Sequence, residues 1–582
     1  MANNSLFRRK SLESVMKNID VADDIHLEQH SKGLKRTLTV RDLTFFGIAA
    51  IIGAGSFSSL GSAIFNGGPG VVLLFVITGI ACAFTAYCYS EFASRIPVSG
   101  SAYTYAYTSF GELFAWVIGW ALIMEYSIGN IYVAFSWSDY FTSFLDKSGI
   151  HIADYLTCSY LEAKKLFDAY TSSLSTDAPM ILTSAQQELK NAWEQAPSIG
   201  GLKIILDLPA FMINIFITAL VYIGVKESRN FSNVMVVLKL AIIVLIILVG
   251  GGLLFSNGLT FNWTPENEEG IKSFMPNGFG GVMMAISGVF FAYIGFDAVS
   301  TMAEEAKNPQ RDLPRGMILS LVICTAVYIL LTLVLSGVVN YKNFDGVGDP
   351  LAFIFEEQNL NIGWMQILVS ICAVVAMTSV LLVFQLGQPR IWMSMSRDGL
   401  LPEKFNTVHP KYKTPSYATI VTGLVVGIPL LFTDKTFVLD FTSIATLFAF
   451  VLVCGGVLLI PRREKEKGRF HMPYVNGKFI YPVIVSSFFI LFCVLNNNYI
   501  SSLFSEQTTY NISTIIFWII CFILSAFAFI RSWSLIPLMG VSTCLYLLTG
   551  MTAKNWLWFS AWLAIGLVIY FMYGKKNSKL NV

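Results

Sequence analysis

The stretch VFFAYIGFDAVSTMAEEAKNPQRDLPR, residues 289–315, decides the fold of this chain. An apolar segment is interrupted at Gly295, carries a carboxylate at Asp297 and then runs into a charged loop. In a bilayer every backbone N–H and C=O group needs a partner, so a broken helix persists only where protein buries it or where it lines a cavity. The stretch therefore predicts a discontinuous membrane helix, and a substrate site is the leading explanation for the break.

The composition is that of an integral membrane protein. Of the 582 residues, 55% are hydrophobic and only 13% are charged, which lies outside the usual range of soluble domains. The net charge of +2 is spread over alternate loops, so no basic surface indicates nucleic acid binding. Eight of the nine cysteines lie in apolar segments without metal-ligand spacing, which argues against a disulfide or zinc framework.

Apolar runs of roughly twenty residues predict about fourteen membrane-spanning helices. They lie near residues 43–64, 70–95, 112–144, 207–225, 230–255, 279–303, 315–338, 363–392, 415–432, 437–460, 478–497, 511–530, 533–551 and 555–573. An even number places both termini on one side, and the loops of that side hold most of the lysine and arginine residues. Because basic loops stay in the cytoplasm, we expect both termini there and the chain in the cell (inner) membrane.

The predicted organisation is one membrane domain with polar ends. Its parts are a cytoplasmic N-terminal segment (1–40), a first repeat of five spans (41–255), a second repeat of five spans (256–460), four further spans (461–574) and a cytoplasmic tail (575–582). A long polar loop, residues 146–206, follows the third span and contains two helix-like patches, LEAKKLFDAY and SAQQELKNAWEQA. The loop is either a small extracytoplasmic cap or a tolerated surface insertion.

The first span contains Gly53, Ala54 and Gly55 near its middle. In an isolated span, close helix packing by small residues would explain them. Here the first and sixth spans are interrupted at matching positions of two five-span halves, a pattern that marks the binding site of inverted-repeat transporters. N–H groups freed at the first break suit a carboxylate, and carbonyls freed at residues 291–295 suit an ammonium group. The paired breaks therefore predict a main-chain receptor for a free amino acid.

Four ionisable residues are predicted inside the membrane, where a charge costs about 2.5 to 3.5 kcal/mol. They are Glu91, Glu125, Lys239 and Asp297. Lys239 is a structural ion-pair partner, a snorkelling side chain or a titrating group; burial disfavours its charged form, so it could couple transport to protons. Glu125 either faces the substrate side chain or satisfies a polar neighbour. Asp297 is expected to cap the second half-helix, and Phe291 is either core packing or a lid over the site.

Four motifs together resemble the amino acid–polyamine–organocation superfamily. They are IIGAGSF in the first span, YSEFASRIPVSGSAYTYAY after the second, FAYIGFDAVSTMAEEAKNPQRDLPRG around the sixth and GQPRIWMSMSRDGLLP after the eighth. Within it the chain is most similar to the cationic amino acid transporter family and its bacterial homologues. The resemblance runs from about Phe7 to Lys579, without the long loop. It implies an all-α integral membrane fold with a five-plus-five inverted-repeat core, discontinuous helices 1 and 6, and four extra helices.

The resemblance also implies a substrate site at the two breaks. Residues 53–55 would receive the substrate carboxylate, and carbonyls around Phe291 and Ile294 would receive its amino group. Phe291 would be the gating aromatic. The candidate substrate-binding residues are Ile51, Gly53, Ala54, Gly55, Glu125, Phe291, Ala292, Ile294, Asp297 and Met377.

Coupling and side-chain selection are assigned by the same resemblance. Lys239 matches a family lysine that replaces the second sodium site and supports proton-coupled uptake. Glu125 matches an acid tied to side-chain selection, and Met377 aligns with a side-chain pocket position. A bulky methionine there argues against a pocket roomy enough for arginine. Two departures from the family are Ser56, where an aliphatic residue is usual, and the long loop after the third span.

The sequence thus predicts a secondary transporter that takes up L-amino acids with protons by alternating access. Sodium coupling, exchange, and a sensor that binds amino acids without transporting them are the alternatives. No phosphate-binding loop supports ATP-driven transport, no catalytic constellation supports an enzyme, and no cofactor is expected. The expected partners are the amino acid, protons and the lipid bilayer, while a small single-span partner is left open.

Overall fold

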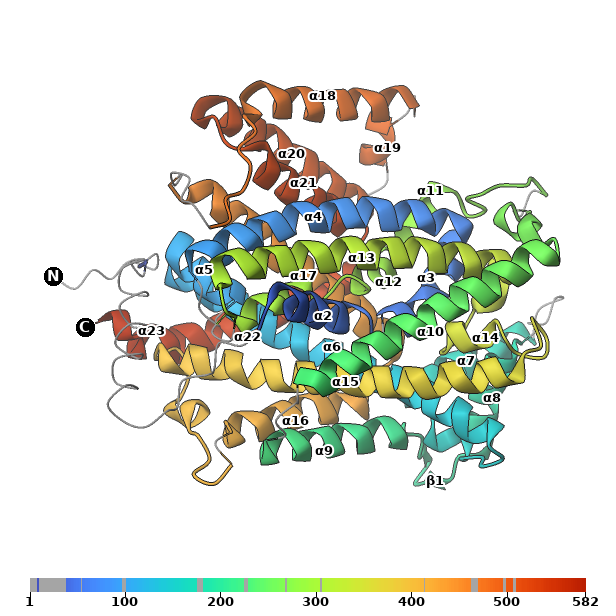
Figure 1. Ribbon diagram of the computed structural model, residues 1–582. Helices are drawn as coiled ribbons and strands as arrows, with labels where there is room; N and C mark the ends of the chain where they lie inside the picture. Colours follow the sequence, from blue (N-terminus) through green and yellow to red (C-terminus); the bar gives the residue numbers. More distant parts are fainter. Residues whose placement is uncertain are drawn as a thin grey trace.

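The computed structural model describes residues 8–9, 38–53, 55–96, 101–174, 182–224, 229–266, 270–303, 306–412, 414–461, 469–495, 499–505 and 509–581. Apart from one short hairpin, the named elements of this part of the chain are helices (Figure 1). Nine helices among the described residues are long and apolar enough to cross a membrane, or ten if a bent pair is one span. The prediction of an all-α membrane fold is confirmed.

Each predicted span coincides with a helix or a broken helix. The unbroken ones are α4 (Val71–Arg95), α6 (Glu112–Lys147), α9 (Leu208–Ile223), α10 (Arg229–Ser256), α13 (Pro309–Val338), α15 (Gly363–Arg397), α16 (Ser416–Leu430), α17 (Lys435–Leu459), α18 (Gly477–Leu495), α20 (Thr509–Arg531), α21 (Leu535–Thr549) and α22 (Ala553–Ile569). Three of them, α9, α16 and α21, have only 15 or 16 residues, fewer than a typical span needs. The number fourteen therefore stays a prediction.

The first and sixth predicted spans are the broken ones. The first consists of α2 (Val40–Ile51), the π-helical turn η1 (Gly55–Ser59) and α3 (Leu60–Gly67). The sixth consists of α11 (Gly278–Met284), α12 (Ile286–Phe291) and the 3-10 helix η5 (Phe296–Met302). Between α12 and η5 lies Gly295, whose φ of +116° is readily adopted only by glycine. The break at Gly295 is thus confirmed, whereas the 42° bend between α11 and α12 was not predicted.

The long helices lie side by side and enclose the two broken spans (Figure 1). In that view α18, α20 and α21 form a separate layer above α4, while α9 and α16 lie below α15. The C-terminal helix α23 (Lys575–Asn577) lies at the left end of the molecule, which we call the terminal face. At the opposite end, the cap face, lie α7 (Tyr160–Ser173), α8 (Ser184–Gln195) and α14 (Pro350–Phe353).

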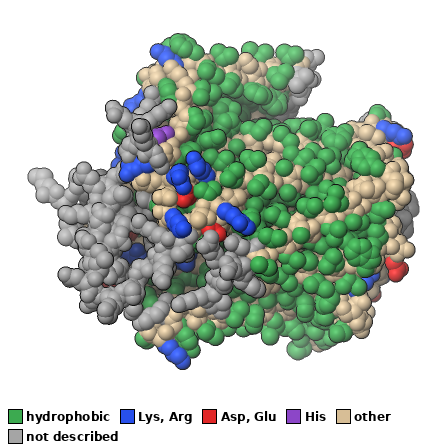
Figure 2. All heavy atoms as spheres, in the orientation of Figure 1, with side chains coloured by type: hydrophobic (Ala, Val, Ile, Leu, Met, Phe, Trp, Pro, Cys, Tyr) green, Lys and Arg blue, Asp and Glu red, His purple; other side chains and the backbone are tan. Residues whose placement is uncertain are grey.

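Apolar side chains fill both the inside and much of the outside of the molecule. One large cluster of buried apolar residues occupies the space between the core helices, and a second, around Tyr481, Trp518 and Cys521, holds the layer of α18, α20 and α21 together. Figure 2 shows that the visible flank of the molecule is also mostly hydrophobic. Because water disfavours so large an apolar surface, these flanks belong in hydrocarbon.

The long loop after α6 folds into a small unit of its own, which we call the cap. Its two predicted helical patches are confirmed as α7 and α8, and strands β1 (Ser198–Ile199) and β2 (Leu202–Lys203) form an antiparallel hairpin. Ala163, Ala196 and Ile205 make a local apolar core beside Trp193. Ser159 accepts a hydrogen bond from the backbone N–H of Glu162 and so caps the start of α7.

Candidate functional site

The two breaks touch each other through their backbones. A Cβ atom added to Gly55 would lie 2.4 Å from the Cα of Ala292, and one added to Gly295 would lie 2.9 Å from the backbone carbonyl of Ala50. No side chain larger than a hydrogen atom fits at either position unless the backbone of the other broken span moves. The glycines predicted from the sequence are therefore the points at which the two broken helices meet.

Tyr328 of α13 joins the two breaks. Its hydroxyl lies 3.0 Å from the carbonyl oxygen of Ile51 and 2.7 Å from that of Ala292, and it is fully buried. Each of these carbonyls closes one half-helix, where the regular helical partner is lost. One hydroxyl thus serves the ends of α2 and α12 together, and a movement of one break away from the other would break this arrangement.

Lys239 of α10 lies against the end of α2. Its ammonium nitrogen is 2.7 Å from the hydroxyl of Ser379 on α15 and 3.5 Å from each of the carbonyl oxygens of Ala49 and Ile52. The residue is only 2% exposed, so its side chain does not snorkel to the surface. Lys239 therefore contacts the first break directly, and Ser379 is a partner that the sequence did not reveal.

Two serines of η1 stabilise the backbone at the first break. Ser56, the departure from the family pattern, donates its hydroxyl to the carbonyl of Gly53 at 3.0 Å. Ser59 bonds to the carbonyls of Gly55 and Gly288 at 2.6 and 2.8 Å, which ties η1 to α12. The backbone around the first break is thus shaped by small hydroxyl side chains as well as by glycine.

The candidate residues that the structure describes are all buried. This set comprises Ile51, Gly53, Gly55, Glu125, Phe291, Ala292, Ile294, Asp297, Met377 and Lys239. Ala54 lies outside the described residues. Val380, one turn from Met377 on α15, lies 2.6 Å through its Cγ2 from the place of a Cβ on Gly53. Met377 is therefore on a helix that packs directly on the first break.

Glu125 and Asp297 form a buried pair of acids near the second break. The Oε2 atom of Glu125 has no hydrogen-bond partner among the described residues. Asp297 lies in the first turn of η5, where backbone N–H groups of Gly295 and Ala298 stabilise its carboxylate. The two carboxyl groups are close enough for their charges to repel. Gly295, not Asp297, is the N-cap of η5, so Asp297 stabilises this helix end only by its charge in the first turn. The Oε2 of Glu125 can receive a hydrogen bond or a cation.

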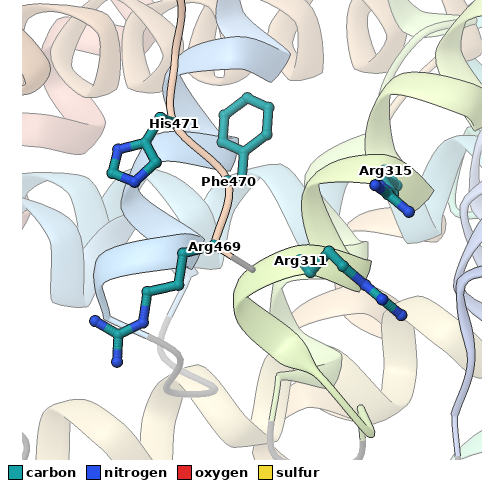
Figure 3. A pocket seen from close by; sticks show the side chains of 5 residues that line it. All are labelled: Arg311, Arg315, Arg469, Phe470 and His471. Carbon is teal, nitrogen blue, oxygen red and sulfur yellow. The ribbon is translucent and has the colours of Figure 1, made fainter. Parts of the chain in front are cut away.

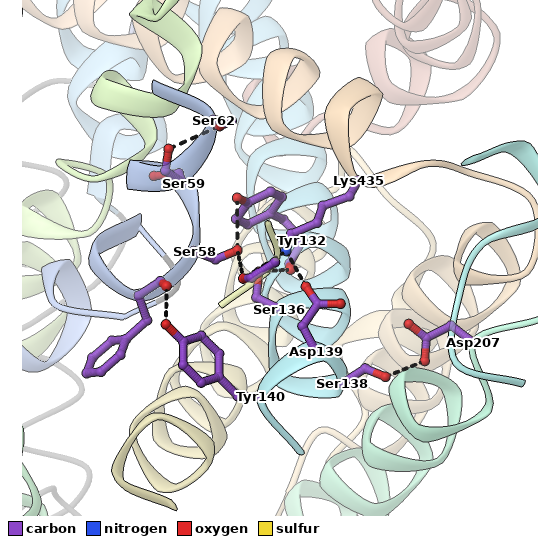
Figure 4. A network of polar contacts seen from close by, with 12 residues as sticks. Ser58, Ser59, Ser62, Tyr132, Ser136, Ser138, Asp139, Tyr140, Asp207 and Lys435 are labelled. Atoms are coloured by element: carbon purple, nitrogen blue, oxygen red, sulfur yellow. Dashed lines mark hydrogen bonds and ion pairs between the residues drawn. The ribbon is translucent and has the colours of Figure 1, made fainter. Parts of the chain in front are cut away.

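Phe291 lies between the second break and the cap face. Its ring meets the ring of Tyr132 edge to face, with centroids 4.5 Å apart. The Tyr132 hydroxyl is 3.5 Å from the hydroxyl of Ser58 in η1, and the ammonium group of Lys435 lies 5.6 Å above the Tyr132 ring. Figure 4 shows this chain of contacts from η1 through α6 to the start of α17.

Charged side chains form a network at the cap face, next to Tyr132. Lys435 forms an ion pair with Asp139 of α6, and its backbone N–H donates to the carboxylate of Glu162 in α7 at 2.9 Å. Lys165, also on α7, pairs with Asp434, the N-cap of α17. The cap is therefore bound to the start of α17 by two residues of one helix, and through Lys435 it is connected to Tyr132 and Phe291.

Residues near both ends of the chain contact one acid at the terminal face. Glu112, fully buried at the start of α6, accepts hydrogen bonds from Arg8 at 3.1 Å, Tyr107 at 3.0 Å and Tyr570 at 2.9 Å, and a further one from Ser578. Arg8 belongs to the N-terminal segment, and Ser578 to the tail. Segments far apart in the sequence thus meet at one buried carboxylate at the start of α6.

The chain is similar to known families over nearly its whole length. Residues 38–521 match the family described as amino acid permease, and residues 534–578 match the one described as the C-terminus of AA_permease. The second match covers the whole of α21 and α22.

Relatives that cover 99% of this chain include three transporters. The branched-chain amino acid permease BcaP of Bacillus subtilis (strain 168) is 36% identical over 578 residues, which are 99% of its own length. The methylthioribose transporter of the same organism is 34% identical over 581 residues, again 99% of its length. Cationic amino acid transporter 3, mitochondrial, of Arabidopsis thaliana is 30% identical over 638 residues, 95% of its length.

Proposed function

The chain belongs to the amino acid permease family, and from this we propose that it carries L-amino acids across the cell membrane together with protons, by alternating access. The terminal face would be cytoplasmic, in agreement with the basic loops of the sequence. The substrate would lie where the breaks meet, with its carboxylate at residues 53–55 and its ammonium group at the carbonyls around Phe291 and Ile294. Phe291 would separate this site from the cap face.

The single observation that carries the coupling proposal is the position of Lys239. Its ammonium group contacts three oxygen atoms, two of them carbonyls at the end of α2. Hard cations such as sodium take the same kind of oxygen ligands. While it is charged, Lys239 thus occupies a place suited to a metal cation and holds the end of α2. Loss of its proton would remove the charge that attracts these carbonyls, and α2 could then move.

For the side chain of the substrate, apolar surroundings favour a neutral amino acid. Met377, Val380 and Phe291 are buried apolar residues at or near the breaks. BcaP is a branched-chain amino acid permease by its name. Glu125 is the feature that would favour a cationic side chain, because one of its oxygens has no hydrogen-bond partner among the described residues. We propose leucine, isoleucine and valine as the first substrates to test, with arginine as the contrast.

Uptake into proteoliposomes tests the proposal. Labelled leucine should accumulate when the outside is made acidic, should accumulate equally with choline in place of sodium, and should lose that accumulation with a protonophore. Accumulation that ignores the pH gradient would contradict proton coupling, and loss in choline would indicate sodium. Binding without accumulation would indicate a sensor.

The name of the methylthioribose transporter adds a competition arm to the same experiment. Methylthioribose lacks both the carboxylate and the ammonium group of an amino acid. If the site is a main-chain receptor for a zwitterion, methylthioribose and decarboxylated amines should compete weakly with leucine. Strong competition by either compound would show that the breaks do not recognise the zwitterion.

A further inference from the structure

A basic cavity of about 290 Å³ lies at the terminal face, away from the breaks. It is lined by Arg311 and Arg315 from the first turns of α13, and by Arg469, Phe470 and His471 from the segment before α18. The two sides are connected, because the backbone N–H of Phe470 donates to the carbonyl of Gln310 at 3.1 Å. The described residues that line the cavity include three arginines and no acid.

The arginines surround the cavity rather than converge on one point. Figure 3 shows Arg311 and Arg315 directed to one side, while Arg469 is directed to the other. Arg311 donates to Asp312 at 2.8 Å, and Arg315 and Arg469 are exposed. Side chains that diverge in this way suit several separate phosphate groups, or one large headgroup, better than a single small anion.

An exposed apolar stripe continues from the cavity along α13. Arg315, Leu319 and Val322 lie at i, i+4 and i+7 and therefore share one face of the helix, and Leu319 and Val322 are 46% and 60% exposed. On the other side of the cavity, α18 presents Phe479 and Val483, which are 64% and 63% exposed. Figure 2 shows basic side chains beside a wide hydrophobic surface. A charged cavity next to lipid-facing apolar surface matches the two ends of a phospholipid.

We propose that this cavity binds the phosphate headgroup of an anionic phospholipid, whose acyl chains lie along the exposed stripe of α13. Basic pockets between membrane helices recognise such headgroups by charge. A soluble phosphate compound shares the headgroup chemistry but gains nothing from the apolar stripe. The lipid also connects α13, which carries Tyr328 of the substrate site, to the segment that leads into α18.

The test is lipid retention by the purified full-length protein, measured by native mass spectrometry with phosphatidylglycerol, cardiolipin and phosphatidylcholine. The variant is Arg315→Gln with Arg469→Gln; Arg311 is kept because Asp312, only 2% exposed, pairs with it. The matched control is Lys404→Gln with Lys411→Gln, which removes two exposed charges from the loop between α15 and α16.

We expect anionic lipid to bind the variant roughly thirtyfold more weakly than wild type, because each basic residue near an anionic surface contributes about fivefold. The control should change by less than about twofold, and phosphatidylcholine should not distinguish the proteins. Equal loss in variant and control would overturn the proposal, since the charges would then act only through the net charge of that face. Displacement of the lipid by millimolar inorganic phosphate or glycerol 3-phosphate would overturn it in favour of a soluble ligand.

Discussion

The two breaks at the centre of the molecule differ in what holds their backbone in place. At the first break, carbonyls of Ala49 and Ile52 face Lys239, a side chain from another helix. At the second, the positive φ of Gly295 and the backbone contacts of Asp297 in η5 are local. Tyr328 contacts both. Under the proposed coupling mechanism, the second break would keep a fixed shape. The first, although Ser56 also holds it from within, would depend on a distant group that gains and loses a proton.

The largest effect is expected from Gly295→Ala, a substitution within the second break. The positive φ costs an L-residue about 1 to 3 kcal/mol, and the new Cβ would lie 2.9 Å from the Ala50 backbone, so the two breaks would be pushed apart. We expect a lower thermal unfolding temperature and loss of leucine uptake in proteoliposomes. Gly258→Ala is the control, because Gly258 has a φ of +66° and open space around its Cβ position. Uptake at wild-type level in Gly295→Ala would show that the second break tolerates movement.

Substitution of Lys239 tests whether the first break depends on a titrating side chain. Lys239→Ala should abolish accumulation driven by the pH gradient and leave some leucine exchange, because the site would remain while the titrating group is lost. Lys239→Arg keeps a charge near the carbonyls but cannot release a proton, so it should also abolish accumulation. We expect at least a tenfold loss of accumulation in both variants, about 1.4 kcal/mol of coupling. Unchanged pH-driven accumulation in Lys239→Ala would remove Lys239 from the mechanism.

Tyr328→Phe tests the link between the breaks. The change leaves two buried carbonyls without their hydroxyl partner, at a cost of about 1 to 3 kcal/mol. Tyr481→Phe is the matched control, because its buried hydroxyl bonds to that of Ser542 in the layer of α18, α20 and α21, away from the breaks. Both variants should lose stability, measured by thermal unfolding, but only Tyr328→Phe should raise the KM for leucine, by about tenfold. Equal KM values in the two variants would show that the hydroxyl serves stability alone.

Residue type and spacing were sufficient to predict the breaks and the buried charges. A lysine within an apolar run has few explanations in a membrane, so Lys239 is informative on its own. Gly295 is informative because it pairs with the glycines of the first span at a matching position. Ser379 was missed because a serine hydroxyl within an apolar span is usually satisfied by its own helix. Tyr328 was missed because the sequence does not show which helices its hydroxyl reaches. Only the packing of α13 and α15 on α2 shows that these two hydroxyls face the break. A buried tyrosine needs a hydrogen-bond partner for its hydroxyl, and this need is the sequence signal that could have indicated Tyr328.

The smallest expected effect is a pH dependence of the cap, which tests whether the second break is isolated from distant side chains. Burial raises the pKa of Glu162 from its ordinary value of 4.5 to about 7, although the N–H of Lys435 acts in the opposite direction. Between these values the folded cap binds more protons than the unfolded chain, so its stability falls as the pH rises through this window.

Hydrogen exchange of α7 at pH 5.5 and 7.5 measures this dependence, with Glu162→Gln as the variant and Glu194→Gln on α8 as the control. The protection factor of wild-type α7 is taken relative to that of Glu162→Gln at the same pH. This ratio should fall roughly tenfold from pH 5.5 to pH 7.5, since one pKa unit corresponds to tenfold. If exchange around Phe291 changes together with α7, the contacts through Lys435 and Tyr132 transmit the change to the second break. A fixed second break requires exchange there to stay constant while that of the cap varies.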